Sequence, residues 1–141
     1  MTVIYLHGNK SKWGSIVYEN GTTLTLMGQA DDYWQSQVGV PEENSNSERA
    51  ILIAVIETLE WVNGENILIF SDNIYCVNLL NDWLPKWRRD SYITNVGSLR
   101  PNYELLLTLD QKLLDVEYNF EAKWITASTP EIREITESLR Q

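Results

Sequence analysis

Few residues in this sequence are of the types that bind transition metals or act as nucleophiles. One histidine, His7, and one cysteine, Cys76, exclude a His-rich metal cluster, a Cys-built zinc site and an intrachain disulfide. His7 stands at the end of a predicted strand, and Asp72 follows another. An imidazole and a carboxylate are both side chains that bind divalent cations.

A basic, Trp-containing segment spans residues 83–100. Its charged residues are Lys86, Arg88, Arg89, Arg100 and Asp90, and its aromatic residues are Trp83, Trp87 and Tyr92. The segment carries a net charge of +3, whereas the rest of the chain carries -12. Two interpretations are open: weak, salt-sensitive contact with nucleic-acid phosphates and bases, or solvated charges on a loop that the aromatic rings anchor.

The elements that position these residues follow from the hydrophobic pattern. β-Branched, alternating or continuous apolar runs predict strands at Thr2–His7, Trp13–Tyr18, Thr22–Met27, Asn66–Phe70 and Val116–Ile125. Helical spacing and capping residues predict helices at Arg49–Val62, Ile74–Leu80, Tyr103–Leu114 and Glu131–Leu139. Asn20-Gly21 marks a tight hairpin, so the first three strands form an antiparallel meander.

The remaining segments are predicted to be connections and caps. Residues 29–47 are polar and acidic, which indicates a surface connection with a short strand around Tyr33–Val40. Ser47 is a predicted N-cap of the first helix, and Ser71-Asp72-Asn73 caps the second. Residues 83–97 are read as irregular or as containing a short helix.

Composition sets the class of protein. A chain of 141 residues, 43% hydrophobic, suits a single domain over residues 1–141. Its formal net charge of -9 argues against a general nucleic-acid binder. The sequence has no apolar run of membrane-helix length and no signal-peptide pattern, so no membrane contact and an intracellular, cytoplasmic location are expected.

Five segments, in order, resemble the type 1 ribonuclease H family. They are Tyr5-Leu6-His7-Gly8-Asn9, Ser47-Glu48-Arg49-Ala50-Ile51-Leu52, Ser71-Asp72-Asn73-Ile74-Tyr75-Cys76-Val77-Asn78, the basic Trp83–Arg89 segment, and Asn102-Tyr103-Glu104-Leu105 before a strand that ends at Trp124. The resemblance implies an α/β ribonuclease H-like fold: a five-stranded mixed sheet flanked by helices, in the element order βββαβααβα. It also implies metal-dependent cleavage of RNA in RNA–DNA hybrids, which requires four carboxylates around two divalent ions.

Carried onto this sequence, the family's four carboxylate positions fall on His7, Ile51, Asp72 and Thr136. Only Asp72 retains the acid, and no histidine occupies the loop around 126–130. The resemblance therefore implies a degenerate site with no resident metal, because one carboxylate supplies too little negative charge for two ions. Mg²⁺ or Mn²⁺ binds only if other carboxylates replace the lost ligands, and the candidates are Glu48, Glu104, Glu134 and Glu137. On the positions that the resemblance assigns, His7 and Asp72 could also hold one softer cation such as Mn²⁺ or Zn²⁺.

The same residues also have structural interpretations. His7 suits a hydrogen-bonded structural histidine, Asp72 an N-cap, Ile51 an extension of the core and Cys76 an inert buried thiol. We therefore expect a catalytically inactive or severely impaired domain that binds an unidentified protein or nucleic acid, the latter through Lys86, Trp87, Arg88, Arg89 and Arg100. A short chain of this kind resembles a viral or mobile-element product. The alternative is a divergent active ribonuclease with relocated metal ligands.

Overall fold

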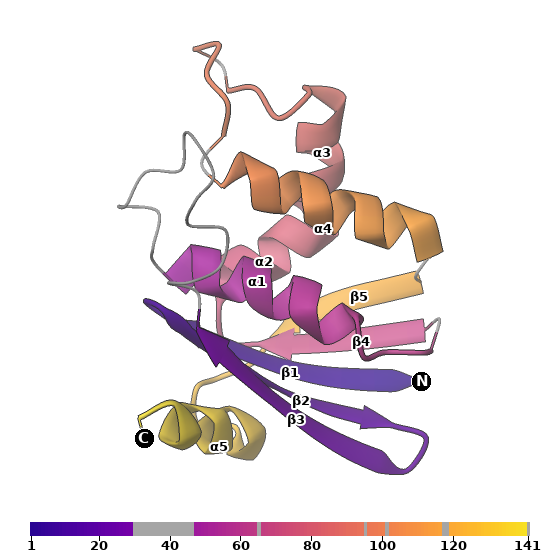
Figure 1. Cartoon of the computed structure of the whole chain (residues 1–141), viewed down its shortest axis with the longest axis vertical. Helices are drawn as coiled ribbons and strands as arrows, with labels where there is room; N and C mark the ends of the chain where they lie inside the picture. Colours follow the sequence, from indigo (N-terminus) through magenta and orange to yellow (C-terminus); the bar gives the residue numbers. More distant parts are fainter. Residues whose placement is uncertain (30–46, 65, 95, 101, 117–118, 141) are drawn as a thin grey trace.

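The computed structural model describes residues 1–29, 47–64, 66–94, 96–100, 102–116 and 119–140 (Figure 1). The predicted strand at Tyr33–Val40 and nearly all of the 29–47 connection lie outside these residues.

One five-stranded mixed sheet organises the chain, as predicted. Its strands are β1 (Thr2–Asn9), β2 (Lys12–Glu19), β3 (Thr22–Gln29), β4 (Asn66–Ser71) and β5 (Asn119–Trp124). In space they run β3-β2-β1-β4-β5, with β1, β2 and β3 antiparallel and β4 parallel to both β1 and β5. Asn20 and Gly21 both have positive φ, which makes the turn between β2 and β3 tight enough for the predicted hairpin.

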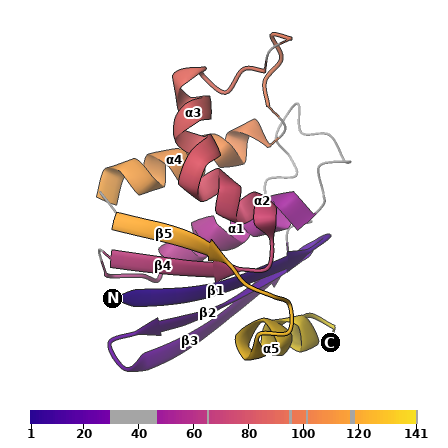
Figure 2. The same ribbon diagram turned by 180° about the vertical axis from the view of Figure 1, so that it is seen from behind.

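Helices lie on both faces of this sheet. They are α1 (Ser47–Leu59), α2 (Ile74–Asn78), the π-helical turn η2 (Leu79–Trp83), α3 (Leu84–Arg89), α4 (Tyr103–Val116) and α5 (Pro130–Leu139). Figures 1 and 2 show α1 to α4 stacked on one face and α5 alone on the other. Within the described residues no helix is long and apolar enough to cross a membrane.

The main core lies between the sheet and the stacked helices. Helix α1 is buried on all sides over Ala50–Ile56, where every residue is at most 3% exposed. The apolar spacing predicts one buried face, but α4 covers the outer side of α1 as well, so Ile53 and Ala54 are also buried. A smaller cluster of Ile16, Ile132, Ile135 and Leu139 attaches α5 to the other face of β1 and β2.

Several predicted boundaries were wrong. The second helix does not end at Leu80: the helical chain continues through η2 and α3 to Arg89. Pro85 falls in the first turn of α3, where a missing backbone N–H is tolerated. Helix α1 includes Ser47 rather than starting after it. Val116 ends α4 instead of opening the last strand, which begins at Asn119.

Candidate functional site

The strand register places His7 beside Asp72. β1 and β4 are parallel neighbours with Leu6 opposite Ser71. The residues that follow them, His7 and Asp72, therefore lie side by side at the same edge of the sheet. His7 Nδ1 lies 2.9 Å from Asp72 Oδ1 and 3.0 Å from Oδ2. Both side chains are about 15% exposed, at 15% and 14%, so the pair is open to solvent on one side only.

Asn73, and not Asp72, caps the helix that follows β4. The Asn73 Oδ1 atom accepts a hydrogen bond from Cys76 N at 3.0 Å, while Ser71 Oγ accepts from Asn73 N at 3.1 Å. The N-cap interpretation of Asp72 is therefore wrong. The Asp72 carboxylate faces His7, and its carbonyl oxygen accepts from Trp124 Nε1 at 3.3 Å.

Ile51 lies close to this pair but belongs to the core. A Cβ atom on Gly8, the residue after His7, would lie 3.2 Å from Ile51 N and 3.3 Å from Ala50 Cβ. The absence of a side chain at Gly8 thus lets the start of α1 pack closely against the end of β1. The Ile51 side chain is 0% exposed within the main core cluster, as its structural interpretation expects.

The other predicted positions do not converge on Asp72. Thr136 Oγ1 donates to Ile132 O at 2.8 Å, a hydrogen bond within its own helix. Glu48, Glu134 and Glu137 are exposed. Glu104 is paired with Arg49, whose Nη1 lies 2.5 Å from its Oε1.

The residues present at this edge do not fit a pair of divalent ions. Such a pair needs several carboxylates directed at one point. Over the described parts of the chain, no group of three or more His, Cys, Asp or Glu side chains is arranged to hold a metal ion. The one carboxylate at the predicted centre is in contact with a histidine nitrogen through both of its oxygens.

A buried ion pair links two of the segments that carry the family resemblance. The Arg49 side chain is 3% exposed and donates to both Glu104 and Asn102 Oδ1, the latter at 3.1 Å. Asn102 adopts a φ of 63°, a left-handed conformation that asparagine tolerates, and stands at the start of α4. Sequence reasoning missed this pair because its members are 53 and 55 residues apart and no local pattern connects them.

The basic segment is anchored to α4 through Asp110. The buried Asp110 carboxylate accepts from Arg88 Nε at 2.7 Å and from Arg88 Nη2 at 2.5 Å. The buried Tyr92 hydroxyl donates to the same carboxylate, and burial is the main cause that raises the pKa of Tyr92. Arg88 and Tyr92 thus anchor the segment, and Tyr92 has no open ring face for a base.

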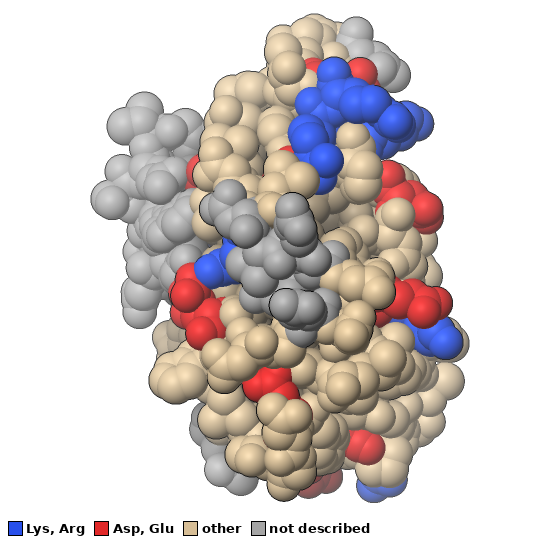
Figure 3. All heavy atoms as spheres, turned by 90° about the vertical axis from the view of Figure 1, so that its right-hand side faces the viewer, with Lys and Arg blue, Asp and Glu red and all other residues tan. Residues whose placement is uncertain are grey.

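The remaining basic and aromatic residues divide into a packed set and an exposed set. Trp83 and Trp87 stack with ring centroids 5.6 Å apart, and the Arg100 guanidinium lies 4.2 Å from the Trp87 centroid. Lys86 and Arg89 are exposed on α3. Figure 3 shows Lys and Arg side chains gathered at the α3 end of the molecule, with acidic side chains spread below.

Cys76 is a buried thiol of the core. It is 1% exposed, and burial together with the nearby charge of Asp72 raises its pKa to about 12. A thiol protonated at neutral pH is a poor nucleophile and a poor metal ligand, as its structural interpretation expects.

The parallel β1–β4 pair, the antiparallel β1–β3 meander and the helices on both faces are the arrangement implied by the family resemblance. The RNase H family model matches residues 5–132, and the chain belongs to this family. A Ribonuclease H of Francisella philomiragia is 26% identical over 114 residues, covering 80% of this chain and 66% of the relative. A Ribonuclease HI of Haemophilus ducreyi is 32% identical over 92 residues, covering 64% and 59%. This chain therefore matches less than two thirds of the length of either relative.

Solved structures agree on the fold. LC9-RNase H1, a type 1 RNase H with the type 2 active-site motif, aligns with a TM-score of 0.67 at 12% identity, over 97% of this chain and 69% of that one. LC11-RNase H1, solved in complex with an RNA/DNA hybrid, aligns with a TM-score of 0.56 at 15% identity, over 100% of both chains. A foamy viral protease-reverse transcriptase, solved with double-stranded DNA, aligns with a TM-score of 0.61 at 13% identity, over 96% of this chain and 90% of that one.

Proposed function

We propose that this RNase H-family domain has lost two-metal hydrolysis and acts by binding. The observation that carries the proposal is the contact made by Asp72, the one acid kept at a family position. Both of its carboxylate oxygens contact His7 Nδ1. The neighbouring family position is filled by Ile51, which is fully buried and offers no donor atom. With Thr136 hydrogen-bonded inside α5, only one of the four positions presents a carboxylate.

Hydrolysis is tested with an RNA–DNA hybrid labelled on its RNA strand, incubated with excess protein and millimolar Mg²⁺ or Mn²⁺. We expect no cleavage above that of an Asp72→Asn preparation purified in parallel. Cleavage that is lost in Asp72→Asn would overturn the proposal in favour of a divergent active ribonuclease.

A gain-of-function variant tests the same proposal from the other side. The triple change His7→Asp, Ile51→Glu and Thr136→Asp restores an acid at each degenerate position. If the three replacements alone account for the lost hydrolysis, the folded variant gains metal-dependent cleavage that the parent lacks. No cleavage by a folded variant would show that restoring the acids is not sufficient, as expected if Thr136 lies away from Asp72. Circular dichroism first shows whether the variant folds, because a carboxylate at residue 51 enters a buried site.

The surface of α3 that carries the exposed Lys86 and Arg89 is the proposed binding face. Its favoured ligand is a nucleic-acid backbone, whose phosphates these two side chains would contact. Arg88 and Arg100 support this face through Asp110 and Trp87. In fluorescence anisotropy at low salt, Lys86→Ala/Arg89→Ala should weaken binding to an RNA–DNA hybrid by about tenfold or more. The matched control is Lys123→Ala/Arg133→Ala, which removes two exposed cations elsewhere. Equal losses in the two double variants would exclude α3 as the binding face.

A further inference from the structure

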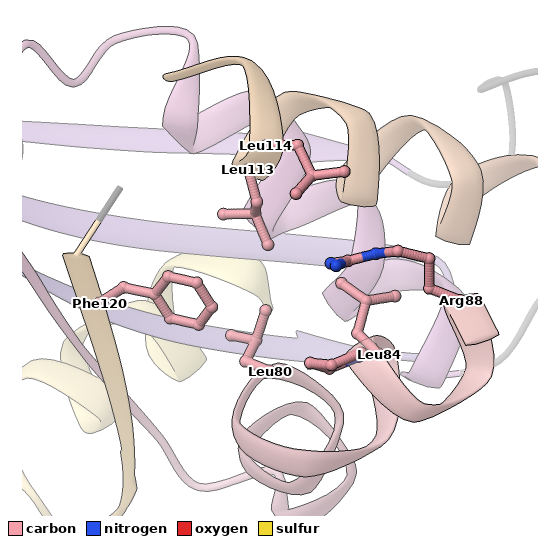
Figure 4. Close-up of a pocket in the computed structure, with 7 residues that line it drawn as sticks. Leu80, Leu84, Arg88, Leu113, Leu114 and Phe120 are labelled. Atoms are coloured by element: carbon pink, nitrogen blue, oxygen red, sulfur yellow. The ribbon is translucent and has the colours of Figure 1, made fainter. Parts of the chain in front are cut away.

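A hollow of about 440 Å³ opens on the helical side of the molecule, between η2, α3, the end of α4 and the start of β5. Its walls include Leu80, Leu84, Leu113, Leu114 and Phe120 (Figure 4). The volume lies in the range of small-molecule sites, and the lining is mostly aliphatic and aromatic, as in such sites.

Part of this apolar wall is in contact with water. Leu114 is 52% exposed and Phe120 is partly buried, whereas Leu80 and Leu84 beneath them are 2% and 1% exposed. An apolar chain placed in the hollow would remove the exposed part of Leu114 and Phe120 from water without displacing the core below. Removal of apolar surface from water favours binding.

One charged group reaches the hollow. In Figure 4 the Arg88 side chain extends from α3 with its guanidinium nitrogens directed between the leucines of α3 and α4. The ion pair with Asp110 engages Nε and Nη2, which leaves Nη1 for another acceptor. Because the Asp110 carboxylate also accepts from Tyr92, a second anion at Arg88 does not leave Asp110 without a hydrogen-bond donor.

We propose that this hollow binds an amphipathic carboxylate, whose hydrocarbon chain packs on Leu84, Leu114 and Phe120 while its carboxylate accepts from Arg88 Nη1. The sign of the ligand's charge follows from the Arg88 guanidinium, the charged group among the residues that line the hollow. The site is separate from the His7–Asp72 pair and does not depend on whether the domain hydrolyses RNA, although Arg88 also supports the proposed nucleic-acid-binding surface of α3.

Decanoate is the probe, kept below the concentration at which it forms micelles and titrated into the whole chain by calorimetry. Shorter members of the series test the apolar walls: from hexanoate to decanoate the affinity should rise by about three- to fourfold per methylene. The neutral decanol tests the charge. We expect it to bind about tenfold or more weakly than decanoate, because its neutral hydroxyl is a weaker acceptor for the Arg88 guanidinium than a carboxylate.

Two matched variants locate the site. Leu114→Gln should weaken decanoate about tenfold, whereas Leu99→Gln, an equivalent change at a leucine that is 57% exposed outside the hollow, should leave it unchanged. Decanol binding as tightly as decanoate would overturn the role of Arg88. Equal effects of the two variants, or no decanoate binding, would overturn the site itself. These outcomes are independent of those that test hydrolysis.

Discussion

Arg49 makes a single-residue connection between α1 and α4. Its guanidinium is buried and meets both the Glu104 carboxylate and the Asn102 side chain. Removing one partner of a buried pair leaves the other without compensation, which costs more than removing both. We expect Arg49→Met to lower the free energy of unfolding by about 3 kcal/mol, measured by urea denaturation.

The double variant Arg49→Met/Glu104→Leu separates this explanation from a loss of packing. It should recover part of the lost stability, since neither charge remains uncompensated. A double variant less stable than Arg49→Met alone would contradict the explanation.

Glu19 makes part of the free energy of unfolding depend on pH. The hydrogen bond from the Thr2 hydroxyl is the largest cause that lowers the pKa of Glu19 below its ordinary 4.5, and burial opposes it. The backbone N–H groups of Asn63 and Gly64 add to the lowering, the latter at 3.0 Å. A lowered folded-state pKa means that this stabilisation is present above pH 4.5 and is lost as pH falls through the folded-state value.

The stability difference between the parent and Glu19→Gln should therefore be constant near neutral pH and shrink below pH 4.5, as followed by urea denaturation at a series of pH values. Glu137→Gln, which removes an exposed carboxylate of α5, is the control. If the stability difference between the parent and Glu19→Gln grows on acidification, the pKa of Glu19 is raised by folding and not lowered.

At the scale of elements, the π-helical turn η2 holds the edge strand β5. The Asn81 amide nitrogen donates to Ala122 O at 2.8 Å, and Ala122 N donates to Asn81 Oδ1 at 3.0 Å. One side chain thus provides both hydrogen bonds that a neighbouring strand would provide. Without Asn81, Ala122 would lose its partners on the outer side of the sheet.

Asn81→Ala should lower the free energy of unfolding by about 1–2 kcal/mol and speed hydrogen exchange at the Ala122 amide. Asn78→Ala, on the same helical stretch, should leave that amide protected. If both variants exchange alike at Ala122, Asn81 does not hold the strand.

The sequence predicts some elements better than others for physical reasons. β1 to β3 have alternating side chains and an Asn-Gly turn, signals that act over a few residues, and their order was correct. The short helix that was one of two alternatives for residues 83–97 is confirmed as α3. Its continuity with α2 was not predicted, because a π turn has no composition of its own and Pro85 resembles a helix end. At the site, the family resemblance assigned His7 and Asp72 to one centre, but their direct contact depends on the parallel pairing of β1 with β4.

At the scale of the whole molecule, charge is divided between a basic α3 end and an otherwise acidic surface. If Lys86 and Arg89 each neutralise one phosphate, the logarithm of the association constant for a hybrid should fall with the logarithm of salt concentration at a slope of about −2. The Lys86→Ala/Arg89→Ala variant should reduce this slope toward zero. A much steeper slope in the parent, or an unchanged slope in the variant, would place the phosphate contacts elsewhere.

Asn73 has a consequence for how such sequences diverge. Because Asn73 holds the first turn of α2, folding does not require an acid at residue 72 to start that helix. Purifying selection on foldability alone would thus allow Asp72 to drift, while it would maintain Asn73. Among descendants of this chain, loss of Asp72 would leave the start of α2 intact, whereas loss of Asn73 would remove the cap of that helix.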